Sequence, residues 1–230
     1  MTTTTKLRDL IEKYKGVNEL SEESVQQLKA VYCSILSEVA SERAYGDDTE
    51  DHIQAVANRV KKIIDWLEDS QFFTSPASTR YHENFEGGLL LHTLRVVAEI
   101  VDIHSLPKFV DKVNLCDAVL VALVHDLCKM GNYESYMRNV KNDDTGRWEQ
   151  VHRYRYVSRK QLPLGHGIAS AYLANRLFNL SVEEYAAILY HMGLFEHDTD
   201  YSVNDMTEAA NRYPLVRMLQ FADQLSITEY

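Results

Sequence analysis

Six side chains that can bind metal ions occupy positions where the sequence predicts burial or a helix end: His92, His125, Asp126, His166, His191 and Asp223. His125 and Asp126 directly follow the apolar run 118–124, and two adjacent polar residues at the end of a buried helix would be costly without partners. Imidazole nitrogen and carboxylate oxygen are atoms with which proteins hold divalent metals. A metal ion would satisfy both residues, so the pair indicates a metal site.

The other four positions have ordinary structural interpretations when each is taken alone. His92 faces inward on a predicted helix, as a core histidine bonded to a carbonyl would, and Asp223 lies in an apolar helix where it could pair with an arginine. His166 follows a glycine at a helix start and His191 lies at a helix end, where each could serve only the terminus. The joint order His, His-Asp, His, His, Asp over five helical segments favours a shared metal centre.

Long helices are predicted to position these side chains, because glycine and proline number only 9 and 4. Apolar spacing and capping residues predict helices over 3–15, 21–39, 48–68, 89–104, 113–130, 166–178, 181–191 and 214–225. The turn sequence 142–146 and the aromatic and arginine residues after it predict a β-hairpin, and 198–205 is expected to be a polar loop. The predicted fold is all-α with an inserted β-hairpin, in which N-terminal helices (1–70) pack on a domain formed by 71–230.

Several local motifs together resemble the HD superfamily of metal-dependent phosphohydrolases. These motifs are Ser75-Pro76-Ala77-Ser78, His82, Gly87-Gly88-Leu89-Leu90, His92-Thr93, His125-Asp126-Leu127-Cys128-Lys129 and Leu164-Gly165-His166. They are most similar to a subgroup that includes the HD domain of bacterial 3′-to-5′ exoribonucleases and the HD-like part of some plasmid relaxases. The resemblance covers about 72–226 and implies an HD-domain helical bundle.

The resemblance also implies a ligand set and catalytic residues. His92, His125, Asp126 and Asp223 would bind a first metal. His166 and His191 would complete a second site, with Asp126 as the bridge, and Lys129 would contact phosphate or the bridging water. The chain departs from the family pattern at Cys128, where glycine is usual, and after His191, where dinuclear members often have a second histidine. The exoribonucleases carry an OB-fold before the HD domain, whereas the first 70 residues here are predicted to be helical.

The expected activity is cleavage of a phosphate ester of a nucleotide or related small phosphorylated substrate by metal-activated water. Asp126 and Lys129 would be catalytic, while Lys129, His82, Arg153 and Arg155 would bind the substrate. The two arginines could equally belong to a solvated hairpin. One or two divalent ions are expected, with Mn, Fe, Mg, Co, Ni and Zn all compatible. Two alternatives stay open: a mixed-valent di-iron HD oxygenase, and a non-catalytic HD binding module.

Composition restricts the partners and the compartment. The formal net charge of −10 repels a phosphate backbone on average, so a nucleic-acid partner is not favoured, whereas a metal ion could attract a small anion. Three widely spaced cysteines suit a reducing cytoplasm better than a disulfide framework. The longest apolar run is too short to span a bilayer and no signal sequence is expected. The oligomeric state is not predicted.

Overall fold

Helices form most of the described chain, which comprises residues 6–44, 49–142, 144–157, 162–196 and 199–228 of the computed structural model. The N-terminal elements are α2 (Leu7–Ile11), the short 3-10 helix η1 (Glu12–Tyr14), α3 (Glu22–Arg43) and α4 (Glu50–Asp69). The elements that follow are α5 (Gly88–His104), α6 (Leu115–Val124), η2 (Leu127–Lys129), β1 (Tyr133–Lys141), β2 (Trp148–Tyr156), α7 (His166–Phe178), α8 (Val182–Tyr190), η3 (Gly193–Phe195), α9 (Asp200–Arg212) and α10 (Pro214–Thr228). The mainly helical class with one two-stranded antiparallel hairpin is confirmed.

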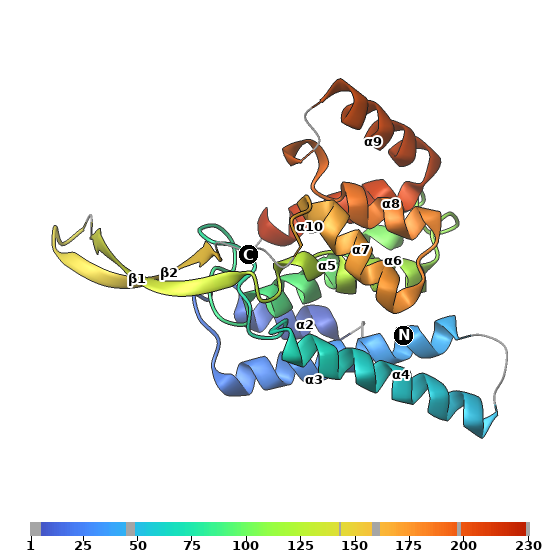
Figure 1. Cartoon of the computed structure of the whole chain (residues 1–230), viewed down its shortest axis with the longest axis horizontal. Coiled ribbons are helices and arrows are strands. Elements are labelled where there is room, and N and C mark those ends of the chain that lie inside the picture. Colours follow the sequence, from blue (N-terminus) through green and yellow to red (C-terminus); the bar gives the residue numbers. More distant parts are fainter. Residues whose placement is uncertain (1–5, 45–48, 143, 158–161, 197–198, 229–230) are drawn as a thin grey trace.

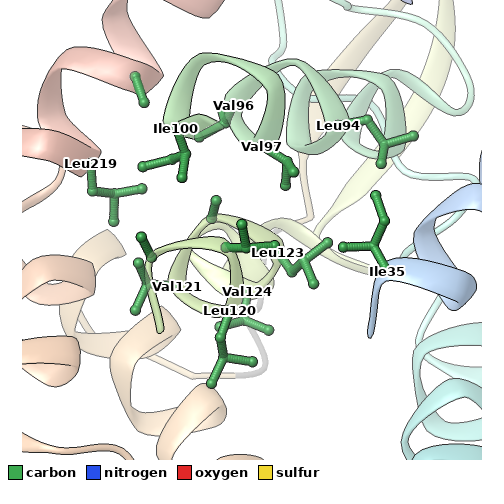
Figure 2. Packing of buried hydrophobic residues seen from close by; sticks show 14 of the residues in the cluster. Ile35, Leu94, Val96, Val97, Ile100, Leu120, Val121, Leu123, Val124 and Leu219 are labelled. Atoms are coloured by element: carbon green, nitrogen blue, oxygen red, sulfur yellow. The ribbon is translucent and has the colours of Figure 1, made fainter. Parts of the chain in front are cut away.

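The central helix of the core is α5, in which every residue from Gly88 to Ile100 is buried. It packs against α6, α10, α2 and α3. Figure 2 shows the aliphatic layer between these helices, with labelled residues Ile35, Leu94, Val96, Val97, Ile100, Leu120, Val121, Leu123, Val124 and Leu219. Full burial of each such side chain contributes roughly 1.5–3 kcal/mol. This layer therefore fixes the backbones of α5, α6 and α10. Helices α5 and α10 carry His92 and Asp223, and α6 directly precedes His125 and Asp126.

Buried charged residues of α5 connect the core to the N-terminal helices. The Arg95 guanidinium pairs with the Glu83 carboxylate and donates a hydrogen bond of 2.9 Å to the carbonyl of Tyr14. Glu99, also buried, accepts a hydrogen bond of 2.8 Å from Arg8. Buried charges are tolerated only when they are paired in this way. The described residues before residue 21 are therefore held in a defined position on α5.

Helix α6 ends at Val124, so the predicted continuous helix over 113–130 is wrong in its last third. Asp126 leaves the helical conformation, with φ −110° and ψ 21°, and the 3-10 helix η2 follows it. Consecutive residues of an α-helix point about 100° apart, so an unbroken helix would not turn both His125 and Asp126 to the same side. The break lets both side chains face the core.

The hairpin projects from the helical body (Figure 1). Strands β1 and β2 are in register from Tyr133 opposite Tyr156 to Lys141 opposite Trp148. The predicted turn is present: the Asn142 side-chain oxygen accepts hydrogen bonds from the backbone N–H groups of Asp144 (3.0 Å) and Thr145 (2.9 Å). Residue 143 of that turn lies outside the described residues.

The C-terminal helices follow the capping signals, with one exception to the prediction. Ser181 and Glu184 form the expected capping box of α8, and Pro214 begins α10, which runs three residues beyond the predicted end. The segment predicted as a polar loop is instead the start of α9, because Thr199 and Ser202 form a capping box there. The predicted helix starts at residues 3 and 48 lie outside the described residues. No described helix combines the length and the apolar character that a bilayer-spanning segment requires.

Candidate metal centre

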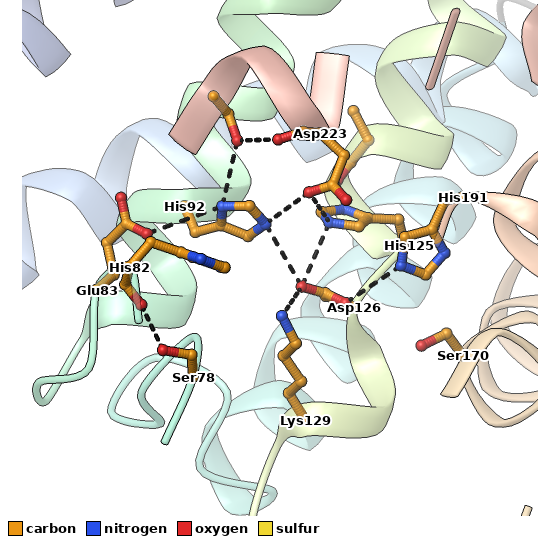
Figure 3. Close-up of polar contacts among 12 residues, drawn as sticks. Ser78, His82, Glu83, His92, His125, Asp126, Lys129, Ser170, His191 and Asp223 are labelled. Atoms are coloured by element: carbon orange, nitrogen blue, oxygen red, sulfur yellow. Dashed lines mark hydrogen bonds and ion pairs between the residues drawn. The ribbon is translucent and has the colours of Figure 1, made fainter. Parts of the chain in front are cut away.

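The six predicted ligands converge in one buried cluster, in which most of them come from helix ends. Figure 3 labels His92, His125, Asp126, His191 and Asp223 of this cluster. His92 lies in the second turn of α5, and His125 is the residue that ends α6. His166 is the first residue of α7, and His191 ends α8. Asp223 lies in the third turn of α10. Ends of short helices can approach one another more closely than helix sides, so several donors fit into a small volume.

Asp126 stands between two groups of histidines and offers one carboxylate oxygen to each. Its Oδ2 lies 3.5 Å from Nε2 of His92 and 3.4 Å from Nε2 of His125. Its Oδ1 lies 2.6 Å from Nε2 of His166 and 3.5 Å from Nε2 of His191. A carboxylate placed in this way can bridge two metal ions.

Asp223 completes the first group. Its Oδ1 lies 3.1 Å from Nε2 of His92 and 3.8 Å from Nε2 of His125. The first group therefore offers two imidazole nitrogens and two carboxylate oxygens, and the second group offers two nitrogens and the other oxygen of Asp126. A third set, His82, Glu83 and His92, shares His92 with the first, so the described residues contain three overlapping sets of donors that could hold metal ions.

Hydrogen bonds on the far side of three rings fix which nitrogen faces the centre. Nδ1 of His125 is 2.8 Å from the carbonyl of Ala122, and Nδ1 of His191 is 2.7 Å from the carbonyl of Ile188. A carbonyl only accepts, so each Nδ1 must carry a proton and Nε2 is the nitrogen that faces the centre, where it could bind a metal ion.

His92 reaches the same state through a hydroxyl group. Ser226 donates its proton to the carbonyl of Asp223 at 2.7 Å, so its oxygen is free to accept from Nδ1 of His92 at 3.4 Å. Partners of this kind orient the histidine ligands of metal sites.

Two of the inward atoms are buried and unsatisfied within the described part of the chain. Nε2 of His125 and Nε2 of His191 have no hydrogen-bond partner there, and their nearest carboxylate oxygens are 3.4 Å and 3.5 Å away. An unpartnered buried polar group costs about 1–3 kcal/mol, so two such atoms facing the same carboxylate form an expensive arrangement. A cation between these nitrogens and Asp126 would satisfy both, and the cluster fits a metal centre for this reason.

The electrostatics of the cluster keep its carboxylates ionised. Burial alone would raise the pKa of Asp126, but the charges of Lys129, His125 and His166 hold it well below the ordinary value. Burial also acts against ionisation of Asp223, whereas its contact with His92 lowers its pKa below the usual range. Burial opposes protonation of Lys129, yet Asp126, 2.6 Å from its Nζ, raises the pKa of the ammonium group. Lys129 is therefore a cation at the edge of the cluster, and its contact with phosphate stays a prediction.

His82 lies at the same centre, on the other side of His92. The two ring centroids are 4.9 Å apart, and the backbone of His82 is held by a 2.7 Å hydrogen bond from the Ser78 hydroxyl to its carbonyl. Burial, followed by the charges of His92 and Lys129, lowers the pKa of His82 to about 3. Its ring is therefore neutral at physiological pH and can donate or accept a hydrogen bond.

The two hairpin arginines make their described contacts within the hairpin rather than with the cluster. Arg155 binds Glu134 at 2.7 Å and lies over the ring of Tyr136. Arg153 donates to the carbonyl of its neighbour His152 at 3.2 Å. Their role in substrate binding stays a prediction.

Two residues of the site were missed by the sequence reasoning. Ser226 could have been found, since it lies three residues after Asp223 on the same helix face. Glu83 could not, because its left-handed backbone (φ 42°) and its pairing with Arg95 depend on the tertiary fold. The Glu83 carboxylate lies 4.0 Å from Nδ1 of His92, so it adds negative charge behind that ring.

The centre opens to solvent on one side. The side chains of Asp223, His166 and Lys129 are 18%, 20% and 11% exposed, whereas those of His92, His125, His191 and Asp126 are at most 2% exposed. A cavity of about 80 Å³ lies beside Lys129 and His166, with mainly apolar walls and Tyr156 of the hairpin root in its lining. A substrate would reach the cluster from this side.

Comparison of the chain with protein-family models, curated proteins and solved structures finds no match. The chemistry proposed below is therefore argued from the arrangement of the side chains.

Proposed function

We propose that this protein is a metal-dependent phosphohydrolase of the HD type, which cleaves a phosphate ester of a nucleotide or a related small phosphorylated substrate. The observation that carries the proposal is the Asp126 carboxylate, shared between two pairs of inward-facing histidines and contacted by Lys129. The resemblance of the His-Asp motif and its surroundings to the HD superfamily supports the same class.

The donor set suits one or two divalent transition metals. Four imidazole nitrogens and two carboxylates are typical of sites for Mn, Fe, Co, Ni or Zn, whereas Mg prefers a shell of oxygen atoms. His92, His125, Asp126 and Asp223 would hold the first ion, and His166, His191 and Asp126 would hold the second. When bound, such ions lower the pKa of a water molecule and neutralise charge that develops on a phosphoryl group.

The chain's own residues would place the phosphate and hold the protons. The ammonium group of Lys129 lies at the open side of the cluster, where it would bind a phosphoryl oxygen and stabilise its developing negative charge. The neutral ring of His82 would contact a second oxygen or the leaving group. Asp126 and Asp223 remain ionised and can accept a hydrogen bond from the attacking water, which orients it toward phosphorus.

The local field explains how an acidic protein would attract an anion. The chain carries a formal net charge of −10, but Lys129 and bound divalent ions would make the centre locally positive. The cavity of about 80 Å³ next to Lys129 would receive part of the remainder of a small substrate. We place the reaction in the cytoplasm, because all three cysteines are free thiols.

A second candidate function is oxygen chemistry at a di-iron centre. It is favoured by one observation, namely that His166 and His191 together with Asp126 form a second set of donors beside the first. Iron bound at close to two ions per chain, with substrate-dependent oxygen uptake, would support this candidate.

The test of the proposed function is hydrolysis by the metal-free protein after addition of Mn²⁺, with bis(p-nitrophenyl) phosphate, nucleoside monophosphates and cyclic nucleotides as substrates. Asp126→Asn should abolish the activity, because the amide cannot bridge two ions as a charged carboxylate does. The matched control is Asp111→Asn, which makes the same change at an exposed loop position and should retain wild-type rates. Equal activity in Asp126→Asn, or no hydrolysis with any metal and substrate, would refute the proposal.

A further inference from the structure

Helix α7 begins without a side-chain cap of its own. Its N-cap residue is Gly165, which has no side chain to accept a hydrogen bond from the first turn. The open N–H groups of a helix start need an acceptor when they are partly buried. Here the acceptor comes from 29 residues further along the chain: the Glu196 carboxylate, whose Oε2 lies 2.8 Å from the backbone nitrogen of Gly167.

The glycines on both sides of His166 make room for this carboxylate. A Cβ atom at Gly165 would lie 2.4 Å from Oε1 of Glu196, and one at Gly167 would lie 3.2 Å from Oε2 and 2.0 Å from the carbonyl of Leu189. The backbone of Gly165 (φ −59°, ψ 160°) is open to any residue, so conformational freedom is not the reason for glycine there. The space is occupied by Glu196.

Glu196 also belongs to the segment that supplies another ligand. It directly follows η3, and that short helix begins two residues after His191. One segment therefore carries His191 and holds the first turn of α7, whose first residue is His166. The two imidazole rings lie 5.0 Å apart as a result.

A second hydrogen bond ties α7 to the third ligand of this group. The buried hydroxyl of Ser170 accepts from the backbone N–H of Cys128 at 3.2 Å, two residues after Asp126. The first turn of α7 is thus fixed between the segment of Asp126 and the segment of His191. Nε2 of His166 reaches Oδ1 of Asp126 at 2.6 Å from this position.

We infer that Glu196 is a positioning residue for the second metal site, where its carboxylate holds the first turn of α7 so that His166 faces Asp126 and His191. The inference rests on the proposed function in one respect, since it requires that a second ion binds among these three residues. Glu196 belongs to none of the donor sets found among the described residues. It acts through the backbone that carries His166.

The test is a Mn²⁺ titration of the metal-free protein that counts bound ions and separates the two affinities. The wild type should bind two ions, and His166→Ala defines complete loss of the second. Glu196→Ala should weaken the second site by about 10–100-fold and leave the first unchanged, as removal of outer partners of metal ligands generally does. Glu196→Gln keeps an acceptor oxygen and should restore most of the affinity.

A second variant disrupts the contact between Glu196 and α7 by a change in α7's N-cap residue. Gly165→Ala places a methyl group 2.4 Å from the carboxylate and should displace it, with the same loss of the second ion. The double variant Gly165→Ala with Glu196→Ala should lose no more than either single variant, because both remove one interaction. Glu208→Ala, an exposed change of the same kind on α9, is the matched control and should bind both ions normally.

The outcomes separate a positioning role from a purely structural one. If the carboxylate were only a structural cap, its loss would lower the thermal stability of the protein and leave both Mn²⁺ affinities unchanged. That result in Glu196→Ala and Gly165→Ala would overturn the inference while the proposed function stood. A wild-type protein that binds a single ion, unaffected by His166→Ala, would overturn the inference together with the two-metal form of the proposed function.

Discussion

Lys129→Met should make the stability of this protein depend on metal far more strongly than it does in the wild type. The Nζ atom of Lys129 lies 2.6 Å from Oδ2 of Asp126, and the two side chains are only 11% and 2% exposed. In the metal-free protein the lysine is the largest of the influences that keep the buried carboxylate ionised against the effect of burial. Methionine fills a similar volume but leaves Asp126 without this partner.

Removal of one partner of a buried ion pair costs about 3–5 kcal/mol. Neighbouring His125 and His166 can offset part of this loss, so the lower end of the range is expected. About 3 kcal/mol corresponds to a fall in Tm of roughly 6–12 °C for a chain of this size. A divalent ion supplies the missing positive charge, so saturation with Mn²⁺ should remove most of the difference.

The assay is thermal unfolding of wild type and Lys129→Met with and without Mn²⁺, beside hydrolysis of bis(p-nitrophenyl) phosphate. The variant should be destabilised only without metal, should bind the ion at least as tightly, and should still lose about 10²–10³-fold in kcat. Lys62→Met, at an exposed position of α4, is the matched control and should resemble the wild type. Equal destabilisation with and without metal, or full activity of the metal-loaded variant, would refute the proposed role of Lys129.

Three other perturbations test separate parts of the site. Ser226→Ala removes the hydrogen-bond acceptor for Nδ1 of His92 and should weaken Mn²⁺ binding at the first metal site about tenfold or more. An unchanged Mn²⁺ affinity would show that Ser226 does not orient His92. His82 has a folded-state pKa of about 3, below its unfolded value, so the metal-free protein should lose stability as pH falls below about 6.5. Measured by urea unfolding, His82→Gln should remove roughly 2 kcal/mol of the stability loss between pH 7 and pH 5. Identical pH profiles of the wild type and the variant would contradict burial of a neutral ring. Arg95→Met leaves Glu83 buried without its partner and should cost about 3–5 kcal/mol in the same assay, while a loss below 1 kcal/mol would show that Glu83 is protonated or hydrated.

The sequence predicted the elements that depend on local signals. The capping box of Ser181, the helix start at Pro214 and the turn at Asn142 are all formed by residues within a few positions of one another. The helix starting near Thr199 has the same kind of signal, which was overlooked because the segment is polar. The end of α6 at Val124 could not be predicted from local signals, because the apolar pattern continues beyond it. The break is explained by the contacts of Asp126 in the folded chain.

The six cluster residues were predicted, but their supporting shell was not. His92, His125, Asp126, His166, His191 and Asp223 share a recognisable order of residue types along the chain. Glu83 and Glu196 act through contacts with residues 12 and 29 positions away, and nothing in their immediate sequence indicates those partners. The sequence therefore indicates which residues could bind a metal. The residues that hold these ligands in place can be identified only from the fold.

Because of the way the hairpin is attached to the helical body, the length of the hairpin does not affect the geometry of the metal centre. Its two ends are joined at the root by the hydrogen bond of 3.1 Å from Val157 N–H to the carbonyl of Asn132, and Tyr133 lies opposite Tyr156. Residue pairs could therefore be added to or removed from the ribbon without changing the distance between Asp126 and His166. Such an insertion can diversify independently of the metal-binding residues, so the length of the ribbon can vary while the geometry of the cluster stays the same.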